Sequence, residues 1–137
     1  MPKILSRSLW TILLLLACVP VTQAAEKAPV KILLIATKTD HPWGSHMYQF
    51  DARLLAACLN QTPGVQASVS MDWPTDPRAL EGIKSIVFYS RPAGEIVLDP
   101  QRRIQFEKMM AQGVGYAAIH WATGIGYSKF AETAAIR

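Results

Sequence analysis

All three histidines of the chain lie in short segments that follow or end hydrophobic runs. His41 and His46 come after the apolar run 30–36, and His120 directly follows the run 115–119. Imidazole changes charge near neutral pH, so converging histidines can act as general acids, general bases or metal ligands. If these runs are parallel strands, their carboxyl ends lie at one edge of a sheet, where α/β folds build ligand sites. The sequence therefore predicts one pocket that contains all three imidazoles.

Within this pocket we assign acid–base roles to His120 and His46. The residues expected to hold a substrate lie beside the histidines or follow another apolar segment, 83–89: His41, Asp40, Trp43, Ser90, Arg91 and Trp121. Aromatic faces beside polar groups suit sugar rings. Structural interpretations stay open, because His41 beside Pro42 fits a turn, His46 fits a helix cap and tryptophans commonly serve as packing residues.

Metal binding is an alternative use of the same side chains. The sequence predicts no cofactor, but His41, His46 and His120 are the ligands we expect if a divalent metal binds. Their number suits a metal site. The spacing from His41 to His46 matches no strong zinc motif.

Two other kinds of chemistry are poorly supported. The turn after the last apolar run reads Ile119-His120-Trp121-Ala122 and has neither Ser nor Cys, so it is no nucleophile elbow. We expect Cys58 in the hydrophobic core, on the apolar face of the first helix. The dinucleotide-binding fingerprint needs several glycines between the first strand and the first helix. That loop contains a single glycine here, Gly44, which excludes the fingerprint.

Strand and helix signals alternate along the chain. Strands are expected at 30–36, at 65–71, at 85–89 within the segment 83–89, and at 115–119, and helices from about 47 to 59, from Pro77 to Gly82 and from Pro100 to Gly113. This alternation predicts an α/β fold with a doubly wound, mainly parallel, flavodoxin-like sheet. With the strand order 2-1-3-4, the ligand crevice lies between the first and third strands.

The first 24 residues have the composition of an export signal. Lys3 and Arg7 precede an apolar run from Leu9 to Val19, and small residues end at Ala24. The run is too short for a stable transmembrane span. We expect an exported, periplasmic or extracellular protein cleaved after Ala24. Alternatively, the segment 15–18 resembles a bacterial lipobox, which would give a membrane-anchored lipoprotein lipidated at Cys18.

The charge and the cysteine content exclude some classes of partner and of covalent cross-link. Removing residues 1–24 takes away two of the 14 basic and none of the 10 acidic residues, which lowers the formal charge from +4 to +2. No basic cluster interleaved with aromatic residues remains, so nucleic acid is not an expected partner. Cys58 is the single cysteine of such a mature chain, which excludes an intramolecular disulfide.

Three blocks together carry a family resemblance: KILLIATKTDHPWGSHMYQFDARLLAACLNQTPGV, DWPTDPRALEGIKSIVFYS and GVGYAAIHWA. Across about residues 30–127 the chain resembles the ThuA-like (trehalose utilisation) family, whose fold is similar to class I glutamine amidotransferases. The resemblance divides the chain into a signal peptide (1–24), a short linker (25–29) and a ThuA-like domain (30–137). Because that family's domain extends further, we expect this one to be C-terminally incomplete.

The resemblance also implies a function. ThuA-like domains are associated with the use of trehalose and related disaccharides, including oxidised 3-keto sugars, so the implied partner is a small-molecule carbohydrate. It places the histidine loop and His120 in the family's pocket. The cysteine of amidotransferases is absent here, so glutaminase activity is not expected. The alternatives are a non-catalytic sugar-binding or interaction module and an inactive fragment; the substrate, the reaction and the oligomeric state stay open.

Overall fold

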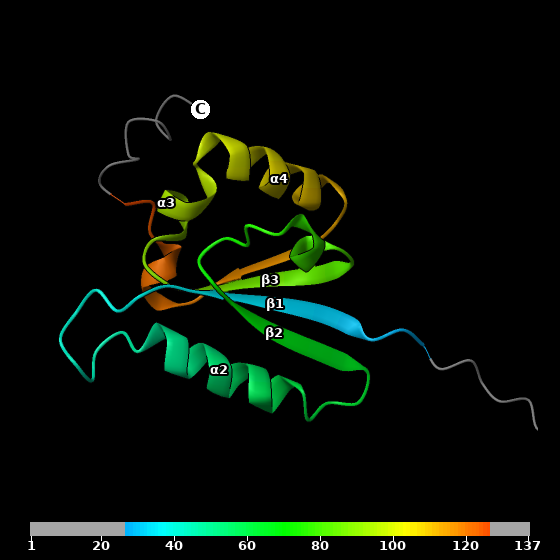
Figure 1. The fold of residues 1–137 in the computed structure, drawn as a ribbon, viewed down its shortest axis with the longest axis horizontal. Helices are drawn as coiled ribbons and strands as arrows, with labels where there is room; N and C mark the ends of the chain where they lie inside the picture. The colour runs from blue at the N-terminus through cyan, green and yellow to red at the C-terminus, as the bar shows by residue number, and fades with distance from the viewer. Residues whose placement is uncertain (1–26, 127–137) are drawn as a thin grey trace, which may run out of the picture.

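The computed structural model describes residues 27–126, and they form one sheet covered by helices on both faces. The strands are β1 (Val30–Ala36), β2 (Val65–Met71), β3 (Ile83–Tyr89) and β4 (Gly115–Ala118). They are all parallel and are ordered β2-β1-β3-β4 (Figure 1). The predicted α/β doubly wound fold and its strand order are confirmed.

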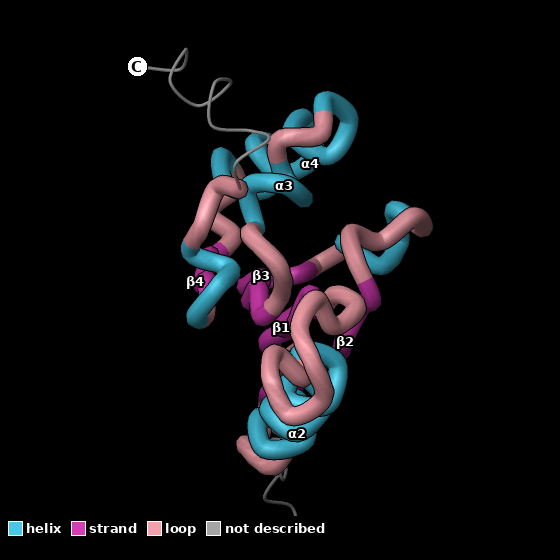
Figure 2. The backbone as a smooth tube through the Cα atoms, turned by 90° about the vertical axis from the view of Figure 1, so that its left-hand side faces the viewer, coloured by secondary structure: helices cyan, strands magenta, loops and turns pink. Residues whose placement is uncertain are grey.

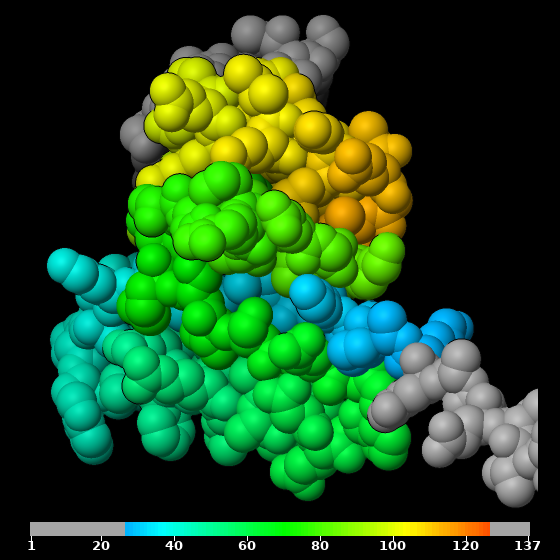
Figure 3. Space-filling view, turned by 45° about the vertical axis from the view of Figure 1, so that its right-hand side comes forward, coloured from blue at the N-terminus to red at the C-terminus, as the bar shows by residue number. Residues whose placement is uncertain are grey.

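Helices on the two faces are unequal in number. Helix α2 (Tyr48–Leu59) covers one face, and α3 (Ala93–Val97) with α4 (Pro100–Ala111) covers the other (Figure 1). Two short 3-10 helices, η2 (Pro77–Leu80) and η3 (His120–Thr123), follow β2 and β4. In the space-filling view of Figure 3, the yellow residues of the α4 region lie at the top and the teal and green residues of the α2 region at the bottom, with blue residues of the β1 segment between them.

Two hydrophobic cores hold the layers together, one on each face of the sheet. On the α2 face, Leu34 and Ala36 pack with Tyr48, Ala52 and Ala56 of the helix. The opposite core contains buried residues of β1 and β3 with those of α3, α4 and the connecting segments: Leu33, Ile35, Trp73, Ile83, Ile86, Phe88, Ala93, Ile96, Met109 and Ala122. Because β1 contributes to both cores, its apolar residues form a continuous run rather than an alternating one.

Helix ends follow the capping signals in the sequence. Asp99 accepts hydrogen bonds from the backbone N–H groups of Gln101 and Arg102, and Pro100 occupies the first helical turn. Asp76 caps η2 in the same way through the N–H of Arg78. Gly113, at φ 81°, ends the α4 segment in the left-handed conformation that glycine adopts without steric cost.

The parallel register aligns the carboxyl ends of the three longer strands. Ala36 at the end of β1 pairs with Met71 of β2 and with Tyr89 of β3, and Phe88 pairs with Ala118 of β4. The segments that leave these ends therefore emerge together, as Figure 2 shows from that side of the molecule. They include the loop after β1 and the 3-10 helix after β4, which carry the three histidines.

Two features differ from the sequence predictions. Cys58 is exposed, so its predicted place in the core is wrong. The α2 residues that contact the sheet repeat at Tyr48, Ala52 and Ala56, and Cys58 lies on another side of the helix. Helix α3 was not predicted, because it has five residues and contains Gly94, too little for a periodic signal.

Some expectations concern residues outside those described. The export signal, its cleavage after Ala24 and the alternative lipidation at Cys18 fall within residues 1–26, and the expected truncation concerns 127–137. Within residues 27–126, the helices are all too short or too polar to cross a membrane.

Candidate functional site

The loop between β1 and α2 gathers one carboxylate and two imidazoles. Asp40 Oδ1 lies 2.8 Å from His41 Nδ1 and 2.9 Å from His46 Nδ1. The two imidazoles are in edge contact, with ring centroids 4.0 Å apart. A single carboxylate oxygen thus orients both histidines of the loop.

Tyr48, in the first turn of α2, anchors this loop to the helix through its hydroxyl group. Its side chain is fully buried, and its hydroxyl donates to Asp40 Oδ2 at 3.1 Å. The same hydroxyl lies 2.9 Å from His46 Nδ1. Tyr48 therefore connects the rigid helix to both members of the Asp40–His46 pair. Sequence reasoning missed it, although a tyrosine two residues after a site histidine, at a helix start, is a signal worth testing.

His120 joins the cluster from the segment after the edge strand β4. It begins η3, directly after β4 and Ile119, and its Nε2 lies 3.2 Å from His46 Nε2. The resulting chain of contacts runs from Asp40 through both ring nitrogens of His46 to His120. Of the three histidines, His46 is the one that bridges the carboxylate to a second imidazole.

Both members of the His46–His120 pair have left-handed backbone conformations, at φ 48° and 55°. For residues other than glycine this costs on the order of 1–3 kcal/mol each. A single hydrogen bond returns a net ~0.5–1.5 kcal/mol. The free energy of the ring-to-ring contact is therefore smaller than the conformational cost of the two strained residues. Such strain is typically found at functional sites.

The hydrogen bonds define where the protons lie. Burial by itself raises the pKa of the Asp40 carboxyl, but the hydrogen bonds from the two imidazoles and the phenol outweigh it and lower that pKa to about 2. Burial, together with the Asp40 carboxylate, raises the pKa of the Tyr48 phenol far above its usual value. The carboxylate only accepts, so His46 Nδ1 carries a proton and its Nε2 presents a lone pair to His120.

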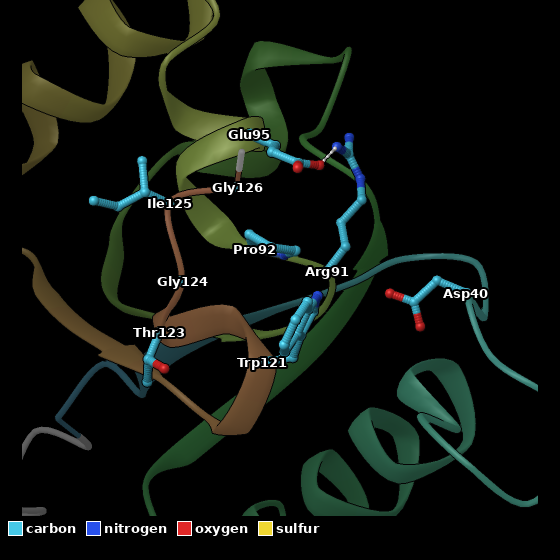
Figure 4. A pocket seen from close by; sticks show the side chains of 9 residues that line it. All are labelled: Asp40, Arg91, Pro92, Glu95, Trp121, Thr123, Gly124, Ile125 and Gly126. Carbon is cyan, nitrogen blue, oxygen red and sulfur yellow. Dashed lines mark hydrogen bonds and ion pairs between the residues drawn. The ribbon is translucent and has the colours of Figure 1, made fainter. Parts of the chain in front are cut away.

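A cavity of about 540 Å³ lies beside the cluster. It is walled by the segment after β3, helix α3 and the strap that follows η3, and Figure 4 shows its lining side chains: Asp40, Arg91, Pro92, Glu95, Trp121, Thr123, Gly124, Ile125 and Gly126. The Trp121 ring connects it to the histidines, with its centroid 6.1 Å from that of His46 and 6.5 Å from that of His41. A molecule in the cavity would contact Trp121 and Asp40.

An ion pair forms the polar wall of this cavity. Arg91 donates to Glu95 Oε2 at 2.8 Å, as the dashed line in Figure 4 marks. Arg91 also lies 3.6 Å from Asp72, which accepts a hydrogen bond of 3.1 Å from Arg102. The guanidinium of Arg91 is therefore held between two carboxylates. Sequence reasoning found Arg91 but missed Glu95.

Glycines allow the strap after η3 to lie directly on α3. The Gly94 N–H donates to Gly124 O at 3.3 Å, and a Cβ built on Gly94 would lie 2.7 Å from the Ile125 backbone. Gly126, at φ 83°, likewise leaves no room for a Cβ beside the Glu95 carboxylate. The strap 124–126 is one wall of the cavity, so these glycines define its shape.

The structure separates the predicted site residues into three groups. His41, His46 and His120 form the cluster, whereas Asp40, Arg91 and Trp121 line the cavity. The other two lie elsewhere. Trp43 is 92% exposed, and Ser90 is fully buried with its hydroxyl donating to Arg91 O at 2.7 Å.

Among residues 27–126, one set of three possible metal-ligating side chains has its ligand atoms within 4.8 Å of one another: Asp40, His41 and His46. His120 reaches this cluster through His46 alone. The three histidines expected as a metal set therefore do not converge on a single point.

Comparison with known proteins adds no relatives: no family model, curated protein or solved structure matches the chain.

Proposed function

We propose that this chain is an exported, ThuA-like carbohydrate-processing domain that acts on trehalose or a related disaccharide, including 3-keto forms. The observation that carries the proposal is the row of contacts from Asp40 through His46 to His120, beside a cavity large enough for a sugar. The three residues of this arrangement and the lining of the cavity come from different elements, namely the loop after β1, the start of η3 and the segment after β3.

The chain of contacts supports proton transfer. Asp40 holds the proton on His46 Nδ1, so His46 Nε2 has the free lone pair of the ring and faces His120 Nε2. A proton taken from a substrate hydroxyl by one imidazole can be shared with the other, and the Asp40 carboxylate stabilises the positive charge that results. His120 and His46 are the acid–base groups, and Asp40 is a positioning residue.

The cavity supports a carbohydrate as the ligand. The indole of Trp121 offers an aromatic face, and Asp40, Arg91 and Glu95 place charged hydrogen-bonding groups around it. Sugar rings combine apolar faces with hydroxyl edges, so they suit a site with this composition. The Arg91–Glu95 pair presents both donors and acceptors to hydroxyl groups.

Turnover by the full chain tests this function. The protein is incubated with trehalose, related disaccharides and their 3-keto derivatives, and released monosaccharide is measured. His120→Asn removes the imidazole while tolerating the left-handed backbone. We expect it to lower kcat by ~10²-fold or more, as for a general acid–base group. Unchanged turnover in this variant would overturn the acid–base role.

Trp121→Ala tests the binding part of the proposal. We expect it to weaken carbohydrate binding, measured by calorimetry, because it removes the aromatic surface of the cavity. Trp43→Ala is the matched control, since Trp43 is 92% exposed and does not line the cavity. Equal weakening in both variants would show that the carbohydrate does not bind at this cavity.

A non-catalytic sugar-binding module is the second candidate. The observation that favours it is that the polar groups are already paired with one another, His46 with His120 and Arg91 with Glu95. Such a module would bind the disaccharide without releasing product, and Trp121→Ala would weaken that binding. Calorimetric binding in the absence of turnover selects this candidate over the enzyme.

Export is part of the same proposal and has its own test. Expression of the full chain in a bacterial host, followed by fractionation and mass spectrometry, identifies the mature N-terminus. A protein that begins at Ala25 supports simple export, whereas a lipid on Cys18 supports the lipoprotein alternative. A chain that retains Met1 in the cytoplasm would overturn export.

A further inference from the structure

The separation of two imidazole nitrogens matches the edge of a metal coordination shell. His46 Nε2 and His120 Nε2 lie 3.2 Å apart. Two nitrogens bound to one tetrahedral zinc ion, each at 2.0–2.1 Å, are about 3.3 Å from each other. We propose that these two Nε2 atoms bind one divalent transition-metal ion with the ligand preferences of zinc.

The contacts around His46 favour its Nε2 as a ligand. Asp40 Oδ1 lies 2.9 Å from His46 Nδ1, and the Tyr48 hydroxyl lies at the same distance. A carboxylate that holds the far nitrogen of an imidazole fixes the tautomer in which the other nitrogen has a free lone pair. Asp40 is thus the outer carboxylate of a carboxylate–histidine–metal arrangement, and Tyr48 supports it.

The backbone is strained at both of these residues. His46 and His120 have φ of 48° and 55°; the third non-glycine residue with a positive φ among residues 27–126 is Asp72, at 67°, outside this pair. As shown above, a ring-to-ring hydrogen bond does not offset both strained conformations. A bound metal ion adds two metal–nitrogen bonds at this point, which gives the strain a functional reason.

The ion is assigned to this pair rather than to Asp40, His41 and His46. In that second set, both Nδ1 atoms already direct their protons at Asp40 Oδ1, at 2.8 and 2.9 Å. A metal there would have to displace both protons and break both hydrogen bonds. At the Nε2 pair it displaces one proton, the one that His120 Nε2 directs at His46 Nε2 and that His120 Nδ1 can carry instead, and it keeps the hydrogen bonds of Asp40 intact.

Two protein ligands leave coordination positions for water or substrate. Trp121 follows His120 directly and lines the cavity, so a ligand in the cavity can approach these positions. A zinc-like ion polarises carbonyl oxygens and lowers the pKa of bound water. The inference rests on the proposed function because it uses the same two imidazoles, but it changes their role. With an ion bound, both Nε2 lone pairs are occupied, and water on the ion would take over the acid–base function of the histidine pair.

Cobalt binding to the full chain tests the inference without an activity assay. After dialysis against a chelator, the protein is titrated with CoCl2 and the visible absorption of Co²⁺ bound to nitrogen is followed. We expect one equivalent to bind and Zn²⁺ to displace it. His46→Asn and His120→Asn should each weaken binding by at least ~10-fold, and Asp40→Asn by ~10–100-fold, as for outer-shell ligands.

His41→Asn is the matched control, because it removes an imidazole from the same loop but not from the Nε2 pair. We expect its cobalt affinity to stay within about 3-fold of that of the unchanged protein. Circular dichroism of each variant confirms that it is folded. Absence of a stoichiometric cobalt band, or a band lost in His41→Asn and retained in folded His120→Asn, would overturn the assignment.

The outcomes for metal and for function are distinguishable. Stoichiometric cobalt binding without any carbohydrate turnover would support the metal site and count against the proposed enzyme. Turnover by chelator-treated protein that binds no cobalt would support the histidine pair acting alone and overturn the metal site.

Discussion

His46 Nε2 and His120 Nε2 lie 3.2 Å apart, although 74 positions separate the two residues in the chain. The parallel register of β1, β3 and β4 creates this contact, because it brings the segments that follow β1 and β4 to the same edge of the sheet. Both residues are in the left-handed region. The fold therefore brings the two histidines together, and their left-handed backbone conformations set the direction of the two side chains.

Strain at His120 predicts an unusual order of stabilities. His120→Gly should be more stable than His120→Ala by roughly 1 kcal/mol, because glycine adopts φ 55° without the steric cost that a Cβ imposes. Urea unfolding of both variants measures the difference. Ala57→Gly in α2 is the control with the opposite sign, since glycine in a helix interior costs ~1 kcal/mol relative to alanine. Equal stability of the two His120 variants would contradict the strain.

Tyr48→Phe removes one hydroxyl from a buried ring. Its loss should lower the free energy of unfolding by about 1 kcal/mol, since Asp40 Oδ2 loses a hydrogen-bond donor. Because Tyr48 positions Asp40 and His46, we expect kcat to fall more than KM changes. Tyr116→Phe is the matched control, because Tyr116 packs against Phe88 and Phe106 away from the histidines. A loss of stability without a change in kcat would leave Tyr48 a purely structural residue.

The lowered pKa of Asp40 predicts that the protein loses stability in acid. Its pKa is lowered from 3.8 to about 2 in the folded protein, so the folded state binds fewer protons than the unfolded state between these values. Its contribution to the free energy of unfolding is complete above pH 4 and is lost as the pH falls towards 2. Urea unfolding from pH 5 to pH 2 should show the unchanged protein converging on Asp40→Asn. A constant difference between them over this range would contradict the lowered pKa.

The sheet was predictable because its strands are short apolar runs, or in β2 an alternation of apolar and polar residues, bounded by turn residues. The segments 30–36 and 65–71 match β1 and β2 residue for residue, the strand expected at 85–89 falls within β3, and the capping pairs at Asp76 and Asp99 fixed where the next helices begin. Helix α3 was not predictable in this way. It contacts α4 and the strap near Gly124, so its stability comes from tertiary packing rather than from its own sequence pattern.

The site was predictable only where position in the sequence implies position in space. Strand ends identified the histidines, Asp40, Arg91 and Trp121. Tyr48 and Glu95 were missed because their roles depend on which way a helix turns them. Cys58 was placed in the core for the same reason, since the spacing of apolar residues on α2 fits more than one face and packing selects the face with Tyr48, Ala52 and Ala56.

Two ion pairs of the same type allow the cavity wall to be tested. Arg91–Glu95 lines the cavity, and Arg103–Glu107 on α4 has the same i,i+4 spacing but lies away from it. Glu95→Gln and Glu107→Gln should each change stability by less than about 1 kcal/mol, because partly exposed pairs contribute little. Only Glu95→Gln should change carbohydrate affinity in calorimetry. The same affinity change in Glu107→Gln would remove the ion pair from the binding site.

Gly94→Ala tests the strap that closes the cavity. The new methyl group would lie 2.7 Å from the Ile125 backbone, so either α3 or the strap 124–126 must move, at a cost of about 1–3 kcal/mol. We expect the free energy of unfolding and the carbohydrate affinity to fall together, because Gly124, Ile125 and Gly126 line the cavity.

Gly115→Ala in β4 is the control for this substitution. Its methyl group would meet the Ser85 hydroxyl at 3.3 Å, and a side chain can turn away where a backbone cannot. We therefore expect Gly115→Ala to leave the carbohydrate affinity unchanged. If Gly94→Ala were as stable and bound carbohydrate as well as the unchanged protein, the strap would not need its close contact with α3, and the cavity would not depend on it.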